Sequence, residues 1–70
     1  MTKTTIFESI GWSKYAESKI EIIEDYSSAN SFEGCDIFID GKYVTGDICT
    51  QDAIRKAFGD EVGEWIIKHM

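Results

Sequence analysis

The sequence has no proline, one histidine and only two cysteines, and these scarcities argue against several kinds of site. Thirteen residues separate Cys35 from Cys49, there is no Cys-x-x-Cys pair, and His69 is the only other soft ligand. Structural zinc needs four such ligands, so no metal site is expected. The sequence contains no phosphate-binding loop, nucleophile elbow or zinc-protease motif. We therefore expect a protein that is not an enzyme and needs no cofactor.

Long apolar runs are also lacking. The longest, Trp65-Ile66-Ile67, is far below the ~18 residues of a membrane-spanning helix, so no membrane association is expected. The first eight residues have no apolar stretch behind Lys3, which is unlike a signal peptide. We expect a cytoplasmic protein, in which Cys35 and Cys49 are free thiols.

Positive charge is nearly absent from the middle of the chain. Between residues 21 and 47, Lys42 alone opposes seven acids, so this segment carries the whole formal net charge of −6. A concentrated negative field repels nucleic acid and attracts basic protein surfaces. The seven acids are Glu21, Glu24, Asp25, Glu33, Asp36, Asp40 and Asp47.

The chain has 70 residues, of which 43% are hydrophobic, which predicts one compact domain spanning 1–70. Near its start, Thr5 and Glu8 have the spacing of a helix capping box, and Ile6, Phe7 and Ile10 form a rough helical stripe. This pattern predicts a helix over 5–17. A strand over 3–10 is the alternative.

The next segments alternate as β-strands do. Residues 19–26 predict a strand, 27–31 a polar loop, and 35–48 a hairpin whose turn is Asp40-Gly41. In this register Phe38 faces Tyr43 and Cys35 faces Gly46, so no disulfide to Cys49 is expected. One face of the hairpin then holds Cys35, Ile37, Ile39, Val44 and Ile48, and the other holds Asp36, Phe38, Asp40, Tyr43, Thr45 and Asp47.

The last segment predicts a helix over 51–68, capped by Thr50. Its core stripe consists of Ile54, Phe58, Val62, Trp65, Ile66 and His69, at spacings of three and four. Gly59 followed by Asp60 could instead divide it into two short helices. Ala53, Ala57 and Ile67 lie behind the stripe, and this second apolar patch suits a homodimer.

The predicted order is α-β-β-β-α, an α+β domain in which an antiparallel three-stranded sheet packs against helices. This order resembles the double-stranded-RNA-binding domain. That family has a lysine cluster at the start of its last helix, where this chain reads Thr50-Gln51-Asp52-Ala53-Ile54-Arg55. Asp52 stands where that family has lysines, so the resemblance implies the architecture of the family and not its RNA binding. An alternative function is a nucleic-acid-binding module that uses the helix-side cations Lys3, Lys14, Lys19, Arg55, Lys56 and Lys68.

An aromatic pair among carboxylates is the candidate site. Phe38 and Tyr43 could anchor a protein partner while acids orient it, or they could only stabilise the hairpin. The acids could equally serve solubility. The predicted partner-binding residues are Glu21, Glu24, Asp25, Asp36, Phe38, Asp40, Tyr43 and Asp47.

These observations favour an inhibitor or regulator that binds a nucleic-acid-handling protein and has no direct contact with nucleic acid. Carboxylates along a sheet can imitate a phosphate track, and such binding weakens with salt. In size and charge the chain resembles phage anti-defence proteins, including anti-CRISPR proteins. An enzyme or redox protein is the third class considered, with Cys49 before the last helix as the only candidate nucleophile.

Overall fold

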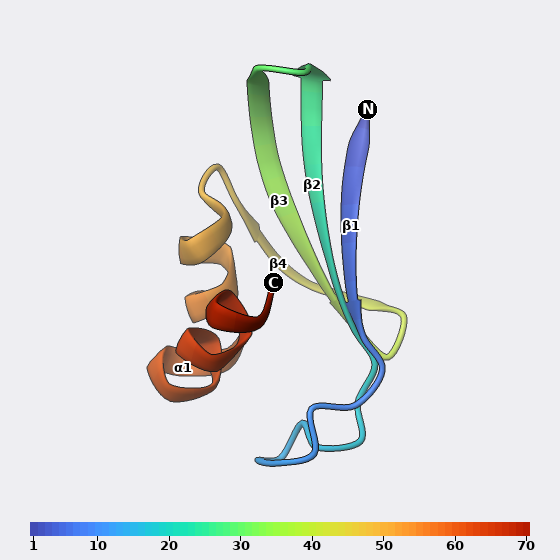
Figure 1. Cartoon of the computed structure of the whole chain (residues 1–70), viewed down its shortest axis with the longest axis vertical. Coiled ribbons are helices and arrows are strands. Elements are labelled where there is room, and N and C mark those ends of the chain that lie inside the picture. Colours follow the sequence, from blue (N-terminus) through green and yellow to red (C-terminus); the bar gives the residue numbers. More distant parts are fainter.

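A computed structural model describes all 70 residues as four strands followed by one helix. The strands are β1 (Thr2–Phe7), β2 (Ile20–Ser28), β3 (Ser31–Ile39) and β4 (Lys42–Asp47), and the helix is α1 (Thr50–His69). Each strand pairs antiparallel with the next, which gives the sheet order β1-β2-β3-β4 (Figure 1). The α+β class is confirmed, but the predicted three-stranded sheet and the α-β-β-β-α order are wrong.

The N-terminal segment forms a strand, so the helix expected over 5–17 is wrong and the alternative is nearer. Thr4, Thr5 and Ile6 are β-branched and favour extended backbone, and β1 pairs along its whole length with β2. Gly11 and Ser13 both have positive φ, which no helix accommodates. Residues 8–19 form an irregular loop, from which Ile10 packs into the core.

The two central strands are longer than predicted. The strand expected over 19–26 extends to Ser28, and β3 begins at Ser31, so the polar loop shrinks to Ala29-Asn30. Ser28 pairs with Ser31 at the exposed end of the hairpin, so both serines belong to the strands. A shift in register near Tyr26 marks where the hairpin departs from a regular ladder.

The Asp40-Gly41 turn is confirmed, with φ of 52° and 81° at its two central residues. Phe38 faces Tyr43 as predicted. Beyond that pair the register shifts by one residue, because Val44 is an extra residue in β4. Cys35 consequently faces Asp47 instead of Gly46.

This bulge reverses the predicted faces of the rest of β4. Thr45 and Asp47 share the face of Ile37 and Cys35, whereas the prediction placed them with Phe38. Val44 and Ile48, expected in the core, are exposed at 44% and 82%. A one-residue bulge moves every later side chain to the other face of the sheet.

Helix α1 begins one residue earlier than predicted and is interrupted at Gly59. Gly59 has φ 82° and ψ 178°, which are not helical, so two helical segments meet there. The possibility of a break at Gly59 and Asp60 is therefore the better description. Thr50 is the first helical residue, and Cys49 occupies the N-cap position without a side-chain hydrogen bond.

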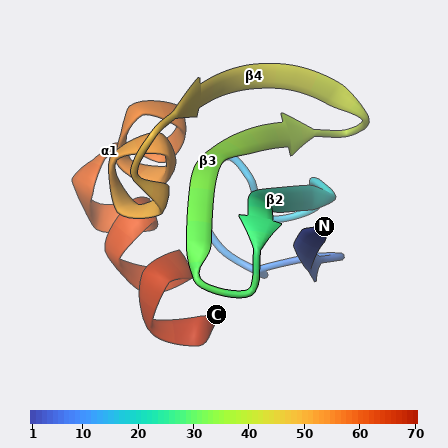
Figure 2. The same cartoon turned by 90° about the horizontal axis from the view of Figure 1, so that it is seen from above.

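The core lies between α1 and one face of the sheet, which we call the helix face. Its fully buried large side chains are Ile20, Ile22, Ile37, Ile54 and Ile66. Seen from above, the sheet is strongly curled, and α1 lies beside β3 and β4 (Figure 2). The loop 8–19 adds Trp12 and Tyr15 around the same core. No helix is both long and apolar enough to cross a membrane.

The helix stripe is confirmed for Ile54, Phe58, Val62 and Ile66, which are buried. His69 is exposed and stacks on the half-buried Trp65, with ring centroids 3.9 Å apart. The second apolar patch does not form as an exposed surface. Ala53 is fully buried, and Ala57 and Ile67 are half-buried against the core.

The break at Gly59 predicts opposite effects for two glycines of one helix. We expect Gly59→Ala to lower the free energy of unfolding by about 1–3 kcal/mol, because its backbone conformation suits only glycine. Gly63→Ala should be neutral or raise stability by up to about 1 kcal/mol, because its added Cβ would meet Arg55 and Ile54 at ordinary contact distances. Urea unfolding followed by circular dichroism measures both. Equal stability of Gly59→Ala and the native chain would mean that α1 is continuous.

Candidate protein-binding surface

The sheet has one face that α1 does not cover, which we call the open face. The strand pairing and the alternation of side chains along each strand define its members. These are Thr2, Thr4 and Ile6 from β1, Glu21, Ile23 and Asp25 from β2, Asp36 and Phe38 from β3, and Tyr43 from β4. The open face therefore combines three carboxylates, two aromatic rings and two isoleucines.

Phe38 and Tyr43 form the predicted cross-strand pair on this face. Their ring centroids are 5.7 Å apart and their planes meet at 73°, an edge-to-face geometry. Tyr43 is 59% exposed although it is large and aromatic. Exposed aromatic rings of this kind are common at the centres of protein interfaces.

Acids lie on both faces of the sheet, but the two cations inside the strands lie on the helix face only. Glu21, Asp25 and Asp36 lie on the open face. The only cations within the strands, Lys3 and Lys42, pair with Glu24 and Ile39 and so lie on the helix face. No cation within a strand therefore neutralises the acids of the open face, and its field is negative within a Debye length of about 10 Å.

Three predicted site residues lie elsewhere. Glu24 is on the helix face, 9% exposed, and accepts a hydrogen bond from the Thr50 hydroxyl at 2.8 Å. Asp40 is in the hairpin turn, where its Oδ1 accepts a hydrogen bond from the backbone N–H of Lys19. The prediction that Glu24, Asp40 and Asp47 share one surface with Phe38 is therefore wrong.

Asp47 is turned toward the helix by the bulge at Val44. It forms an ion pair with Lys56 at 2.9 Å and accepts a hydrogen bond from the backbone N–H of Cys49. These two hydrogen bonds, that with Lys56 above all, lower the pKa of Asp47. Asp47 thus joins β4 to the start of α1 and is not free for a partner.

Strand β1 contributes residues that the predicted site omitted. Ile6 is 48% exposed and pairs with Glu21, and Thr4 pairs with Ile23. The signal is the run of β-branched residues at 4–6, which also supports the alternative of a strand over 3–10. A helix over this segment would remove these side chains from the sheet.

The two cysteines are free and have different environments. Cys35 is buried beside Thr50, and this burial raises the pKa of its thiol to about 11. Cys49 is exposed at the start of α1. No group of three or more His, Cys, Asp or Glu side chains is arranged to hold a metal ion.

Comparisons of the chain with protein families, with curated proteins and with solved structures find no match.

The pKa of Cys35 predicts a loss of stability at high pH. The unfolded chain releases this proton near the ordinary value of 9.0, whereas the folded chain holds it to about 11. The stabilisation is complete below pH 9.0 and is lost as the pH rises to about 11, up to about 3 kcal/mol. Chemical denaturation at several pH values measures this slope, which should be shallower in Cys35→Ala and unchanged in Cys49→Ala. Equal slopes in all three proteins would contradict the assignment.

Proposed function

We propose that this chain is a small acidic binding protein that inhibits or regulates a nucleic-acid-handling protein by docking its open face on a basic surface. The observation that carries the proposal is that three carboxylates share the face of the Phe38–Tyr43 pair, which α1 leaves uncovered. No catalysis is needed for such a role. A phage anti-defence protein that acts in the cytoplasm, in the manner of anti-CRISPR proteins, would have this character.

The two kinds of side chain would have different tasks. Glu21, Asp25 and Asp36 would attract and orient lysine and arginine side chains, which raises the association rate and selects basic partners. Phe38 and Tyr43 would form the centre of the interface, from which water is excluded. Carboxylates that occupy a phosphate-binding groove in this way act as a nucleic-acid mimic and block the groove sterically.

The alternative of a nucleic-acid-binding module has less support. It rests on the α-β-β-β-α order, which is not the order of this chain. Two of its helix-side cations are already engaged, because Arg55 pairs with Glu64 at 3.0 Å and Lys56 pairs with Asp47. The experiment below is therefore designed so that it would also detect direct binding of nucleic acid.

Reversal of two charges on the open face tests the proposal. The variant Glu21→Lys/Asp36→Lys is compared with Asp60→Lys/Glu61→Lys, which makes the same change of net charge on exposed residues of α1. Tagged proteins are used for pull-downs from nuclease-treated bacterial lysate at low and moderate salt. Bound proteins are identified by mass spectrometry, and circular dichroism checks that each variant is folded.

We expect the native chain and the α1 variant to retain a basic nucleic-acid-binding protein at low salt. The open-face variant should lose at least about ten-fold in retention, because like charges facing each other at an interface cost several kcal/mol. A partner that is indifferent to the open-face variant would contradict the proposal. Retention of nucleic acid from untreated lysate, lost only on substitution of Lys56, would favour the alternative function.

A further inference from the structure

A pocket lies on the helix face, between the end of the β2–β3 hairpin and the start of α1. Its volume is about 420 Å³, and it is open to solvent, so it suits a side chain of a partner more than an enclosed small molecule. Glu24 and Tyr26 line it from β2, Phe32 from β3, and Ile48, Cys49 and Thr50 from the β4–α1 junction. The pocket is on the opposite side of the sheet from the open face, so a ligand could bind it whether or not the proposed function is correct.

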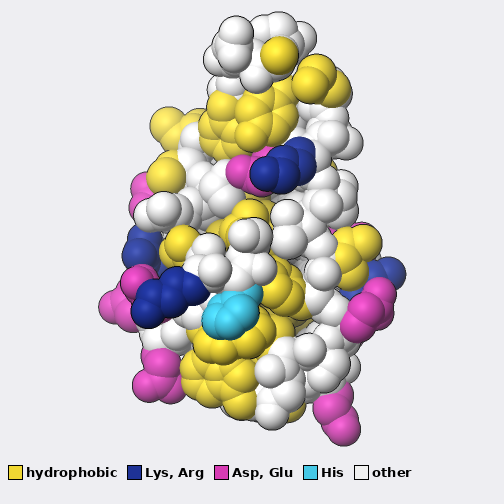
Figure 3. Space-filling view, viewed as in Figure 1, with side chains coloured by type: hydrophobic (Ala, Val, Ile, Leu, Met, Phe, Trp, Pro, Cys, Tyr) yellow, Lys and Arg dark blue, Asp and Glu magenta, His cyan; other side chains and the backbone are white.

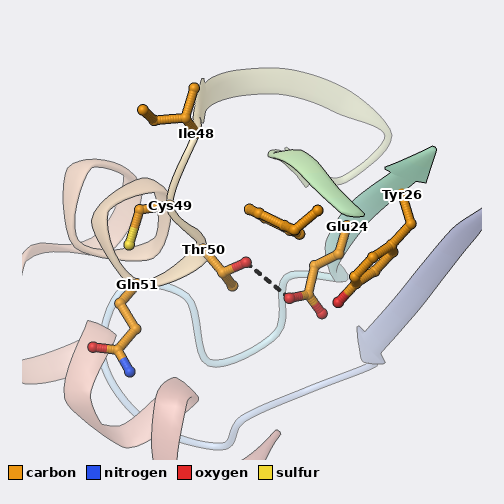
Figure 4. Close-up of a pocket in the computed structure, with 7 residues that line it drawn as sticks. Glu24, Tyr26, Ile48, Cys49, Thr50 and Gln51 are labelled. Carbon is orange, nitrogen blue, oxygen red and sulfur yellow. Dashed lines mark hydrogen bonds between the residues drawn. The ribbon is translucent and has the colours of Figure 1, made fainter. Parts of the chain in front are cut away.

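Glu24 supplies the charged group of the pocket. Its carboxylate accepts one hydrogen bond, from Thr50 to Oε2, while Oε1 accepts none from the protein. Figure 4 shows the Glu24 side chain between Thr50 and Tyr26, at the wall of the pocket. A carboxylate in a residue that is only 9% exposed is a strong acceptor for a charged donor, because little water competes for it.

The other walls combine aromatic and aliphatic side chains with the polar Thr50 and Gln51. Tyr26 and Phe32 pack edge to face with ring centroids 5.4 Å apart. Phe32 is 37% exposed and Ile48 is 82% exposed, and neither is needed to close the core. Figure 3 shows hydrophobic side chains near the upper end of this face, beside one acidic and one basic side chain. A carboxylate beside aromatic rings is a setting that recognises organic cations.

We propose that this pocket binds the side chain of an arginine presented by a protein partner. The guanidinium group would donate to Glu24 Oε1 and stack on the Tyr26 ring, and its aliphatic stem would lie against Ile48. Arginine suits the site better than lysine, because its planar group stacks on aromatic rings and loses less hydration on burial. The positive end of the α1 dipole disfavours a bound cation. The negative charge of Glu24, which accepts a hydrogen bond from Thr50 at that end of the helix, offsets this effect.

We expect Lys3 to compete with the arginine for Glu24. It pairs with Glu24 across β1 and β2 and shares the helix face, yet no ion pair joins its ammonium group to the carboxylate. Its exposed side chain could swing toward Glu24 when the pocket is empty. An arginine that enters would replace it, so removal of Lys3 should strengthen binding. This increase in affinity is the opposite of the decrease that removal of a binding residue produces.

The test uses two peptides that differ in one charge. The first is acetyl-Gly-Gly-Arg-Gly-Gly-amide, and the second has citrulline, the neutral isostere, in place of arginine. Each is titrated into the ¹⁵N-labelled full chain while amide resonances are followed by NMR. We expect the arginine peptide to shift Tyr26, Thr50 and Gln51 with a dissociation constant in the millimolar range. The citrulline peptide should shift them little.

Three variants assign the effect to the pocket. Glu24→Gln keeps an acceptor for Thr50 and should weaken binding of the arginine peptide at least five-fold. Lys3→Met should strengthen it by two-fold or more. Glu61→Gln, which removes one exposed acid of α1, should leave it unchanged. The NMR spectrum of each variant shows whether it is folded, and Tyr26→Leu provides a second loss-of-binding variant if Glu24→Gln is not.

Equal binding of the two peptides, or no effect of a folded Glu24→Gln variant, would overturn the proposal. Weaker binding in Lys3→Met would also overturn it, because Lys3 would then be part of the site. Shifts confined to open-face residues such as Glu21 and Asp36 would show that the peptide binds there instead. Only this last result concerns the open face, so the pocket proposal can fail while the open-face proposal stands.

Discussion

The structure depends on one constraint: a single helix can cover only one face of a four-stranded sheet. The largest fully buried side chains are five isoleucines that pack between α1 and the helix face, and burial of such apolar surface is the main force that folds a chain of 70 residues. The loop 8–19 completes that cover with Ile10, Trp12 and Tyr15. Nothing in the chain remains for the other side of the sheet. The open face is thus a consequence of how the core forms.

The bulge at Val44 decides which acids are free. Without it, Asp47 would lie on the open face and Val44 would point into the core. With it, Asp47 pairs with Lys56 and holds the beginning of α1 against β4. The acids consequently have distinct structural settings: Asp47 is engaged, Glu24 is buried in a pocket, and Glu21, Asp25 and Asp36 form the open face. A formal charge of −6 alone does not distinguish these settings.

Local signals in the sequence predict the second half of the fold well. The Asp40-Gly41 turn, the pairing of Phe38 with Tyr43 and the buried stripe of Ile54, Phe58 and Val62 each depend on contacts close in sequence. The bulge could not be predicted, because it depends on how β4 meets α1. In the N-terminal segment the capping-box spacing is a local signal that favours a helix. The segment forms a strand because it pairs with β2, which lies more than a dozen residues away in the sequence.

The candidate site could be predicted in part for the same reason. Glu21, Asp25, Asp36 and Phe38 share a face because alternation is regular over these parts of β2 and β3, and the turn sets Tyr43 opposite Phe38. Glu24 is predicted to be in the site because of its charge alone. It follows the buried Ile20 and Ile22 at a spacing of two residues, which already indicates that it lies on the helix face. Its contact with Thr50 joins segments far apart in the chain, and only the folded arrangement brings them together.

The most direct test is a ¹³C-edited NOESY spectrum, because the proposed interface requires α1 to lie on the opposite face of the sheet. We expect cross-peaks between the methyl groups of Ile54 or Ile66 and those of Ile22 or Ile37. Ile23 and Phe38 should show no cross-peaks to α1. Cross-peaks from α1 to Ile23 or Phe38 would mean that the helix covers the face described here as open, and the proposed interface would then not exist.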